Sequence, residues 1–491
     1  MMYRKEPNLM DESLKQKTFS GLVWTFIETI ALQGFGFIQG VILARQLMPS
    51  DYGLIAMTGI FFSMSYVLMD AGFTSSLIRS KDRTSLDYST VFITNIVLSL
   101  IFCCILSFSS SLISDFYEEP MLKEIVIVNA LLMFLGSFVS VQGTRLTIQL
   151  KFKVKSIISV ISTIIPGICS IILAYMGYGV WSLIYPNFMG LLIKAVLYWH
   201  YQHWFPGFRF SWNVYKKHFS YGRNLMVSGI LNTFYDNINP IVIGKLYSAS
   251  HLGYYNKAQG YAILPSSTIS GVLLKVTFPV LSTIQDDNAR LEQIYRQMIR
   301  VTAFVIFPIM IMLSVLARPF VLCLLTEKWA DCIPYLQILC FSLMWHPVST
   351  LNLNLLGVKG YSNLYLRLEV IRKIIGVLVL CVTIPLGIIA MCYGQIFVSI
   401  VVLIINTYYT GKLINVNLKV QIQDLLPSFL CSLMTGLLVY VTICFVTSNL
   451  YQIFIGLLVG GTFYILTSKI LRFREYFILL DFLKKFFPRK V

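Results

Sequence analysis

Charged side chains are scarce in this sequence. Only 12% of its 491 residues are Asp, Glu, Lys or Arg, whereas 57% belong to the set AVILMFWYC. A soluble domain carries roughly 25% charged residues on average, so this composition excludes a soluble enzyme. The apolar residues are spread evenly along the chain instead of being gathered into separate cores. We therefore expect one domain that crosses a membrane many times.

Motifs for nucleotide, metal and hydrolytic chemistry are also missing. Gly411-Lys412 is followed by Leu413, so it does not complete the phosphate-binding loop GxxxxGK[ST]. The sequence has no HExxH, no paired CxxC and no GxSxG, and the connections between its apolar segments are too short to hold a catalytic domain. Its ten cysteines lie almost all within apolar segments, where Cys usually acts as a small buried hydrophobe. We expect no cofactor, no metal site, no disulfide framework and no enzymatic activity.

Long apolar segments are what the chain does contain. A helix needs about 20 predominantly apolar residues to cross the hydrocarbon layer of a bilayer. We expect an all-α integral membrane protein with about fourteen transmembrane helices, of which the twelfth and fourteenth are short. The segments are residues 18–43, 54–77, 90–112, 122–144, 156–175, 180–199, 225–246, 258–281, 301–325, 333–356, 364–392, 395–409, 425–445 and 451–467.

The positions of the basic residues predict the orientation of these helices. Most of the 39 Lys and Arg residues lie before the first segment, in alternate loops after it, and in the C-terminal tail. Lys and Arg near helix ends are retained in the cytoplasm, so we expect both termini to be cytoplasmic. The first apolar run lacks a small-residue cleavage site and should remain as the first transmembrane helix. The net charge of +17 then follows from topology and does not imply a nucleic acid partner.

A short internal repeat is found when the chain is compared with itself at an offset of 200 residues. It pairs residues 44–47 with 244–247, Ser50 with Ser250, and Gly53 with Gly253. Because the offset contains an even number of helices, the two halves would be related by a pseudo-two-fold axis along the membrane normal. We expect a cytoplasmic N-terminus at 1–17, six-helix lobes at 18–210 and 211–424, two appended helices at 425–467, and a basic cytoplasmic tail at 468–491.

Two acidic residues, Glu28 and Asp236, lie deep within apolar segments. An ionisable side chain near the bilayer centre costs about 2.5–3.5 kcal/mol on insertion scales, so it normally faces a cavity or a partner. Helical spacing places each acid in a polar stripe, and we expect both stripes to line a cavity between the lobes. Hydrogen bonding between helices is the alternative role. The stripes are Thr25, Glu28, Gly36 and Gln39, and Ser228, Asn232, Asp236 and Asn239.

Several basic side chains lie near the cytoplasmic halves of these segments. They could supply positive charge to a cavity that receives a phosphate or an acidic sugar. Lys194 and Lys275 could instead extend toward the lipid headgroups, and Arg372 could pair with Glu369 on its own helix. The full set is Arg145, Lys194, Lys275, Arg367 and Arg372. His346, with Ser342 and Ser349 near its face, is either an ion-coupling residue, like Glu28 and Asp236, or a packed polar residue.

Several short motifs resemble those of Wzx-type lipid-linked oligosaccharide flippases, in particular the colanic-acid-exporter-like branch. The motifs are ARQLMPSDYGLIAM at 44–57, DAGFTSSLIR at 70–79, SDFYEEPML at 114–122, IGKLY at 243–247, LGYYNKA at 252–258, FPVLS at 278–282 and LRLEVIRK at 366–373. The likeness extends from about residue 13 to residue 373. Family members often carry a basic residue directly after the first glycine of the turn at 356–360, whereas Val358 precedes Lys359 here. The role of Lys359 is therefore open.

This resemblance implies a two-lobed member of the multidrug/oligosaccharidyl-lipid/polysaccharide superfamily with a central V-shaped cavity. We predict that Glu28, Asp70, Asp236 and Lys275 border this cavity between the lobes. It implies that an undecaprenyl-diphosphate-linked oligosaccharide repeat unit is moved from the cytoplasmic to the periplasmic leaflet of the bacterial inner membrane by alternating access, for surface polysaccharide assembly. The implied partners are this substrate, the phospholipid bilayer, H⁺ or Na⁺, and polysaccharide polymerases.

Two alternative functions remain open. A cation-coupled multidrug exporter of the same superfamily would need an acid-rich cavity. A membrane glycan polymerase or ligase would need a large periplasmic loop that carries Arg or His, and no predicted external loop is that long.

Overall fold

The computed structural model describes residues 9–486, and all the regular elements in this range are helices. The predicted all-α class is thus confirmed. Ten of the described helices are long and apolar enough to cross a membrane, and the count of fourteen crossings stays a prediction. The chain divides into two compact units, Met1–Gly253 (unit 1) and Tyr254–Val491 (unit 2). The predicted lobe boundary at 210/211 also stays a prediction. The helix that follows this boundary packs against α2 within unit 1.

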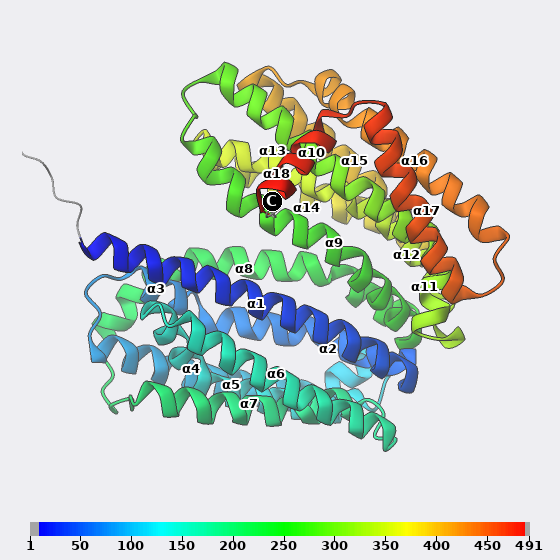
Figure 1. Ribbon diagram of the computed structural model, residues 1–491. Helices are drawn as coiled ribbons and strands as arrows, with labels where there is room; N and C mark the ends of the chain where they lie inside the picture. The colour runs from blue at the N-terminus through cyan, green and yellow to red at the C-terminus, as the bar shows by residue number, and fades with distance from the viewer. Residues whose placement is uncertain (1–8, 487–491) are drawn as a thin grey trace, which may run out of the picture. The chain divides into compact units, whose positions relative to one another are not determined.

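Unit 1 is a bundle of long helices with one short helix inserted after the second (Figure 1). Neighbouring pairs are α4 with α5, α1 with α6, α6 with α7, and α2 with α8. The helices are α1 (Leu9–Gln46), α2 (Pro49–Asp70), α3 (Phe73–Arg79), α4 (Ser85–Tyr117), α5 (Leu122–Ile148), α6 (Phe152–Tyr175), α7 (Trp181–Gln202), α8 (Trp212–Leu246) and the start of α9 (Ala249–Ser282).

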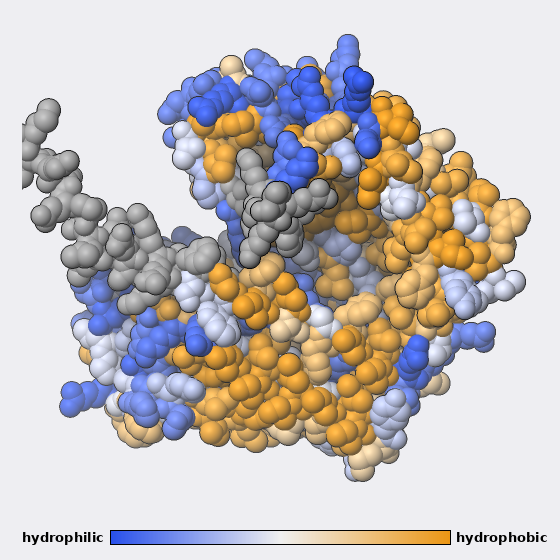
Figure 2. All heavy atoms as spheres, in the orientation of Figure 1, coloured by the Kyte–Doolittle hydropathy of each residue, from blue (hydrophilic) through white to orange (hydrophobic). Residues whose placement is uncertain are grey.

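The packing of unit 1 is that of a membrane protein. In α6, Ile165 and Ile172 are 46% and 53% exposed, whereas Ser162 and Ser170 are buried. Lipid gives no hydrophobic reason to bury large side chains, so helices in a bilayer associate through small residues and hydrogen bonds. Figure 2 shows a broad apolar face on this unit with hydrophilic side chains gathered at both ends. Such an apolar band flanked by polar ends matches a bilayer.

The predicted segment 54–77 is divided into α2 and α3 by a sharp turn. Ala71 and Gly72 both have positive φ, at 41° and 74°. Gly72 lies directly against the backbone of Gly222 in α8. A side chain at Gly72 would overlap α8, and one at Gly222 would overlap the turn. The Asp70 carboxylate accepts hydrogen bonds from the Thr74 amide at 3.2 Å and from the Thr74 hydroxyl at 2.6 Å. Asp70 thus caps α3 and stabilises the turn.

A buried polar network holds α8 against α3 and α4, and sequence analysis did not single it out. The His218 ring is fully buried, with Nδ1 2.8 Å from the Ser76 hydroxyl and Nε2 3.0 Å from the Asp87 carboxylate. The same carboxylate accepts a hydrogen bond from the Thr84 amide and lies 3.7 Å from the Lys217 ammonium. Each polar group of the cluster has a partner, as burial requires.

Unit 2 continues from α9 with a second set of helices. Its elements are α10 (Asn288–Val315), α11 (Ala317–Leu324), η1 (Glu327–Trp329), α12 (Cys332–Leu343), α13 (His346–Val358), α14 (Ser362–Thr383), η2 (Ile384–Leu386), α15 (Ile388–Ile414), α16 (Leu418–Cys444), α17 (Asn449–Ile470) and α18 (Arg474–Phe486). Arg296 and Arg300 of α10 contact Asp424 of α16 at 2.8 and 3.2 Å, and Arg300 also pairs with Glu475 of α18 at 3.0 Å. This ion network joins three helices of the unit.

The predicted boundary between the eleventh and twelfth segments was wrong. Sequence analysis placed segments at 364–392 and 395–409, whereas α14 ends at Thr383 and α15 begins at Ile388 and has 27 residues. Pro385 and Gly387 separate the two helices, and Gly387 has a φ of 99°. Pro cannot continue the helical hydrogen bonds and Gly permits the left-handed turn. Apolar residues continue through this turn, which is why hydropathy did not reveal it.

The two copies of the internal repeat lie against each other in unit 1. A methyl group at Gly53 of α2 would overlap the Ala249 carbonyl of α9, and one at Gly253 would overlap the Pro49 carbonyl. The contact is reciprocal, because each glycine lies against the backbone near the other glycine. Near the same end, the Lys245 ammonium donates to the Glu118 carboxylate at 2.8 Å, and this hydrogen bond lowers the pKa of Glu118.

This crossing predicts a strict requirement for glycine. Gly53→Ala and Gly253→Ala should each lower the free energy of unfolding by about 1–3 kcal/mol, because the added methyl meets backbone and not a movable side chain. The thermal midpoint (Tm) of the purified protein measures the effect. Gly260→Ala is the control in α9, because no atom lies within 4 Å of its Cβ position. Equal Tm values for all three variants would contradict the close crossing.

Candidate substrate-binding cavity

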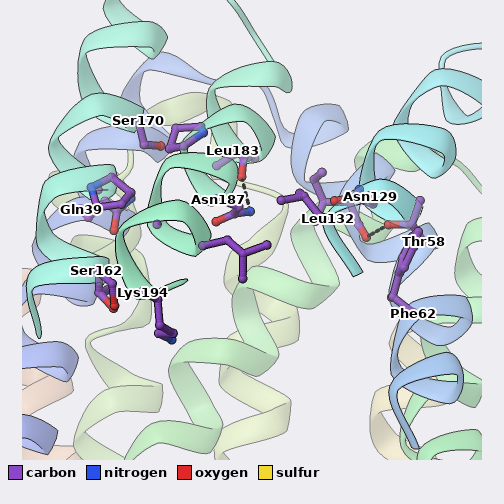
Figure 3. A pocket seen from close by; sticks show the side chains of 18 of the residues that line it. Gln39, Thr58, Phe62, Asn129, Leu132, Ser162, Ser170, Leu183, Asn187 and Lys194 are labelled. Atoms are coloured by element: carbon purple, nitrogen blue, oxygen red, sulfur yellow. Dashed lines mark hydrogen bonds between the residues drawn. The ribbon is translucent and has the colours of Figure 1, made fainter. Parts of the chain in front are cut away.

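A cavity of about 620 Å³ lies inside unit 1, between α1, α2, α5, α6 and α7. Its volume falls in the range of ligand pockets, roughly 300–1,000 Å³. Figure 3 shows Gln39 and Ser162 on one side, Thr58 and Asn129 on the other, and Asn187 between them. The polar residues that line it are Gln39, Thr58, Ser63, Tyr66, Asn129, Ser162, Thr163, Ser170, Asn187 and Lys194.

Two prolines each remove one backbone hydrogen bond from a helix beside this cavity. Pro166 of α6 and Pro186 of α7 lack the N–H group that would donate to the carbonyl four residues earlier, at Ser162 and Ser182. The Ser170 hydroxyl donates to the Ser182 carbonyl at 2.6 Å and so replaces the missing donor. In membrane proteins such interrupted helices are tolerated where they line a cavity.

Close helix packing brings the wall residues together. A Cβ atom at Gly190 of α7 would lie 2.8 Å from the Ser162 carbonyl, and one at Gly167 of α6 would lie 3.1 Å from the Gln39 side-chain oxygen. Only glycine therefore allows α7 and α1 to approach α6 this closely. The predicted stripe residue Gln39 lines this cavity within unit 1.

Lys194 is the one charged residue among those that line the cavity in the described chain. It interacts electrostatically with the Glu28 carboxylate and with Lys155. Glu28 accepts a hydrogen bond of 2.6 Å from the Ser156 hydroxyl, and the Lys155 ammonium donates to Thr147 at 2.8 Å. The lining thus combines hydroxyls and amides with one cation. Such a wall is suited to bind a hydroxylated ligand and offers no acid for a cation.

Arg145, predicted to lie near a cavity between the lobes, is not among the residues that line this cavity within unit 1. Its guanidinium carbon is 4.6 Å from the ring centroid of Trp204 and 5.3 Å from that of Tyr88. A guanidinium over an aromatic face gains cation–π stabilisation. Arg145 therefore joins α5 to α4 and to the segment after α7.

The predicted polar stripe of α8 shares one face but does not line the cavity. Asn232 and Asp236 are exposed and Asn239 is half-buried. The adjoining side of α8 faces α2, since the Cβ position of Gly229, seven residues before Asp236, lies 2.8 Å from the Val67 side chain. The stripe thus borders the side of α8 that packs against α2, and its predicted place at a cavity between the lobes stays a prediction.

The predicted residues of unit 2 are distributed over α9, α13 and α14. Lys275 and Arg367 are exposed, and Arg372 pairs with Glu369 at 3.0 Å, which was the alternative reading of that cluster. His346 begins α13, where the predicted segment 333–356 is divided, and its Nδ1 is 3.2 Å from the Ser270 hydroxyl. The two serines expected near it bond to α15 instead, Ser342 to Ser399 and Ser349 to Asn406.

Sequence analysis missed most of the cavity wall, namely Thr58, Ser63, Tyr66, Asn129, Thr163 and Asn187. These residues are uncharged, and single polar residues in apolar segments are common. A usable signal was present in the prolines, however. Pro166 and Pro186 lie within two consecutive apolar segments, and a helix that contains proline is tolerated in a membrane protein where a neighbouring helix or a cavity satisfies the freed backbone groups.

Comparison with known proteins agrees with this architecture. The Lipopolysaccharide biosynthesis protein WzxC of Escherichia coli (strain K12) is 26% identical over 334 residues, which are 67% of either chain. The Teichuronic acid biosynthesis protein TuaB of Bacillus subtilis (strain 168) is 24% identical over 87% of this chain and 89% of that protein.

Solved structures share the fold at low sequence identity. The Lipid II flippase MurJ in an inward closed conformation has a TM-score of 0.71 at 17% identity, over 92% of this chain and 99% of that one. An inward-facing multidrug resistance MATE family transporter of the MOP superfamily has a TM-score of 0.60 at 15% identity, over 80% and 98%. Residues 42–334 match the family described as "Polysaccharide biosynthesis protein". This match covers more than half of the sequence and confirms the resemblance found in the motifs, so the chain belongs to the polysaccharide biosynthesis protein family.

Proposed function

We propose that the chain is a flippase that moves an undecaprenyl-diphosphate-linked oligosaccharide repeat unit from the cytoplasmic to the periplasmic leaflet of the bacterial cytoplasmic membrane. The observation that carries this proposal is a polar cavity inside a bundle of apolar helices, with no acid among the described residues that line it. A sugar headgroup cannot cross hydrocarbon without hydrogen-bonding partners. A polyprenyl tail can stay in the lipid throughout. The family and its relatives support a role in polysaccharide export.

The alternatives fit the site less well. A cation-coupled drug exporter would need acidic residues in the cavity, and the one charge that the described lining carries is a lysine. A polymerase or ligase would act on the transported product outside the cell, and relatives named for transport, such as the Succinoglycan biosynthesis transport protein ExoT of Rhizobium meliloti (strain 1021), favour export.

The transport cycle that we propose is alternating access in a two-lobed, fourteen-helix protein with both termini in the cytoplasm. Lys194 borders the cavity, and Lys275 and Arg367 are exposed bases that would meet an arriving diphosphate. Arg145 and Arg372 already have partners, so we assign them positioning roles. Polysaccharide polymerases would receive the product.

Deletion of the gene is the first test. Lipid-linked repeat units should accumulate in the cytoplasmic leaflet, because the headgroup has no other route across the bilayer. Treatment of intact and of lysed cells with a glycan-cleaving enzyme, followed by lipid extraction, measures the accessible fraction. Accumulation of unpolymerised units on the outer face would instead identify a polymerase. Normal surface polysaccharide with no accumulation would refute the flippase.

The cavity itself is tested by Asn187→Leu, which replaces an amide on its wall with an apolar group of similar size. Export should fall several-fold at matched protein levels in the membrane, because a hydroxylated cargo loses a partner. Asn363→Leu is the control, since Asn363 is an exposed residue of α14. Equal export by both variants, measured as surface polysaccharide in the complemented deletion strain, would remove the cavity from the transport path.

Energy coupling is proposed to use H⁺ or Na⁺ bound at Glu28, Asp236 or His346, because no nucleotide motif is present in the sequence. In proteoliposomes, an imposed pH or sodium gradient should accelerate flipping, and Asp236→Asn should abolish that acceleration if this residue binds the ion. A dithionite-quenching assay with a fluorescent lipid-linked oligosaccharide measures the rate. Flipping that is indifferent to both gradients would exclude ion coupling.

A further inference from the structure

Lys194 is the one cation on the wall of an otherwise uncharged cavity, as far as the described residues go. It lies on α7 at i+7 from Asn187, and Gly190 lies between them on the same face of the helix. Figure 3 shows Lys194 on the same side of the cavity as Ser162, with Asn187 nearby. A ligand that bonds to the amide of Asn187 would therefore extend along the helix toward the lysine.

The counter-charge of Lys194 is the Glu28 carboxylate, which is hydrogen-bonded to another residue. The Glu28 carboxylate interacts with Lys194 through space, while its Oε2 accepts the 2.6 Å hydrogen bond from Ser156 of α6. The two charges do not form a contact ion pair of the kind that joins Arg372 to Glu369 in unit 2. Within the part of the chain that the structure describes, no carboxylate lies at contact distance from the Lys194 ammonium, and Glu28 acts on it only through space.

We propose that Lys194 binds an anionic group of the cargo, and that this anion replaces Glu28 as the partner of Lys194 when the cavity fills. The proposal rests on the flippase function proposed above. The anion is either the carboxylate of an acidic sugar or the diphosphate of the lipid carrier. The neutral hydroxyls and amides around Lys194 are the groups that recognise sugar hydroxyls, so the acidic sugar is the favoured source.

Glu28 has a defined part in this exchange. While the cavity is empty, its negative charge reduces the cost of keeping the lysine ionised among apolar helices. When an anion arrives, Glu28 competes with it for the same ammonium. Removing the charge of Glu28 should therefore strengthen anion binding, whereas removing the charge of Lys194 should weaken it. A general folding defect cannot produce these opposite effects.

The test uses the purified full-length protein in lipid nanodiscs and isothermal titration with three probes. The probes are a disaccharide that ends in glucuronate, its neutral glucose analogue, and undecaprenyl diphosphate. Lys194→Gln should bind the glucuronate probe at least tenfold more weakly and leave the neutral analogue unchanged. Lys194→Arg should stay within a few-fold of the wild type, and Glu28→Gln should bind more tightly. Lys153→Gln removes an exposed charge from α6 and should match the wild type.

Each outcome decides a specific point. A loss confined to undecaprenyl diphosphate keeps Lys194 as the anion site and assigns the anion to the lipid carrier. Unchanged affinity of Lys194→Gln for both anionic probes, or an equal loss for the neutral analogue, would overturn the proposal. Weaker binding by Glu28→Gln would remove the exchange. The flippase function fails separately, if the deletion strain accumulates no lipid-linked units while the purified protein still shows this binding pattern.

Discussion

Polar groups that enter a bilayer have to be satisfied by the protein itself, and the wall between α6 and α7 is built around this constraint. Pro186 deprives the Ser182 carbonyl of its helical donor, and the Ser170 hydroxyl of the neighbouring helix supplies another at 2.6 Å. Gly190 permits the close approach that this bond requires. The cavity exists because backbone interruptions and small residues occur together at the same level of both helices.

The same constraint explains the fully buried networks at other places in the protein. In unit 2, the Asn352 side-chain oxygen accepts hydrogen bonds from Tyr295, Thr410 and Gln421, and all four side chains are buried. In unit 1, both ring nitrogens of His218 are hydrogen-bonded, one to a residue of α3 and the other to a residue of α4. These clusters are satisfied within the protein, which indicates structural roles. The cavity wall differs because its hydroxyls and amides border an open space.

Charge is used sparingly, and its placement separates this cavity from that of a cation exporter. In the function that we propose, one lysine, with Glu28 as its counter-charge, gives the wall a preference for anionic or neutral cargo. The MurJ and MATE structures share the fold at 17% and 15% identity, so similar helical bundles carry different chemistry. The chemistry of the lining, and not the fold, therefore supports the assignment of cargo.

The sequence by itself determined the membrane class, the positions of nearly all long helices and the family, because these follow from hydropathy, charge placement and local motifs. It also contained the repeat whose copies meet at Gly53 and Gly253. Tertiary structure alone decided that Asp70 caps a helix, that Arg145 packs on aromatic rings, and that Lys194 lines a cavity. The direction in which a side chain points depends on which helices pack together. In a bilayer, apolar residues face lipid as well as other helices, so hydropathy does not show which helices are neighbours.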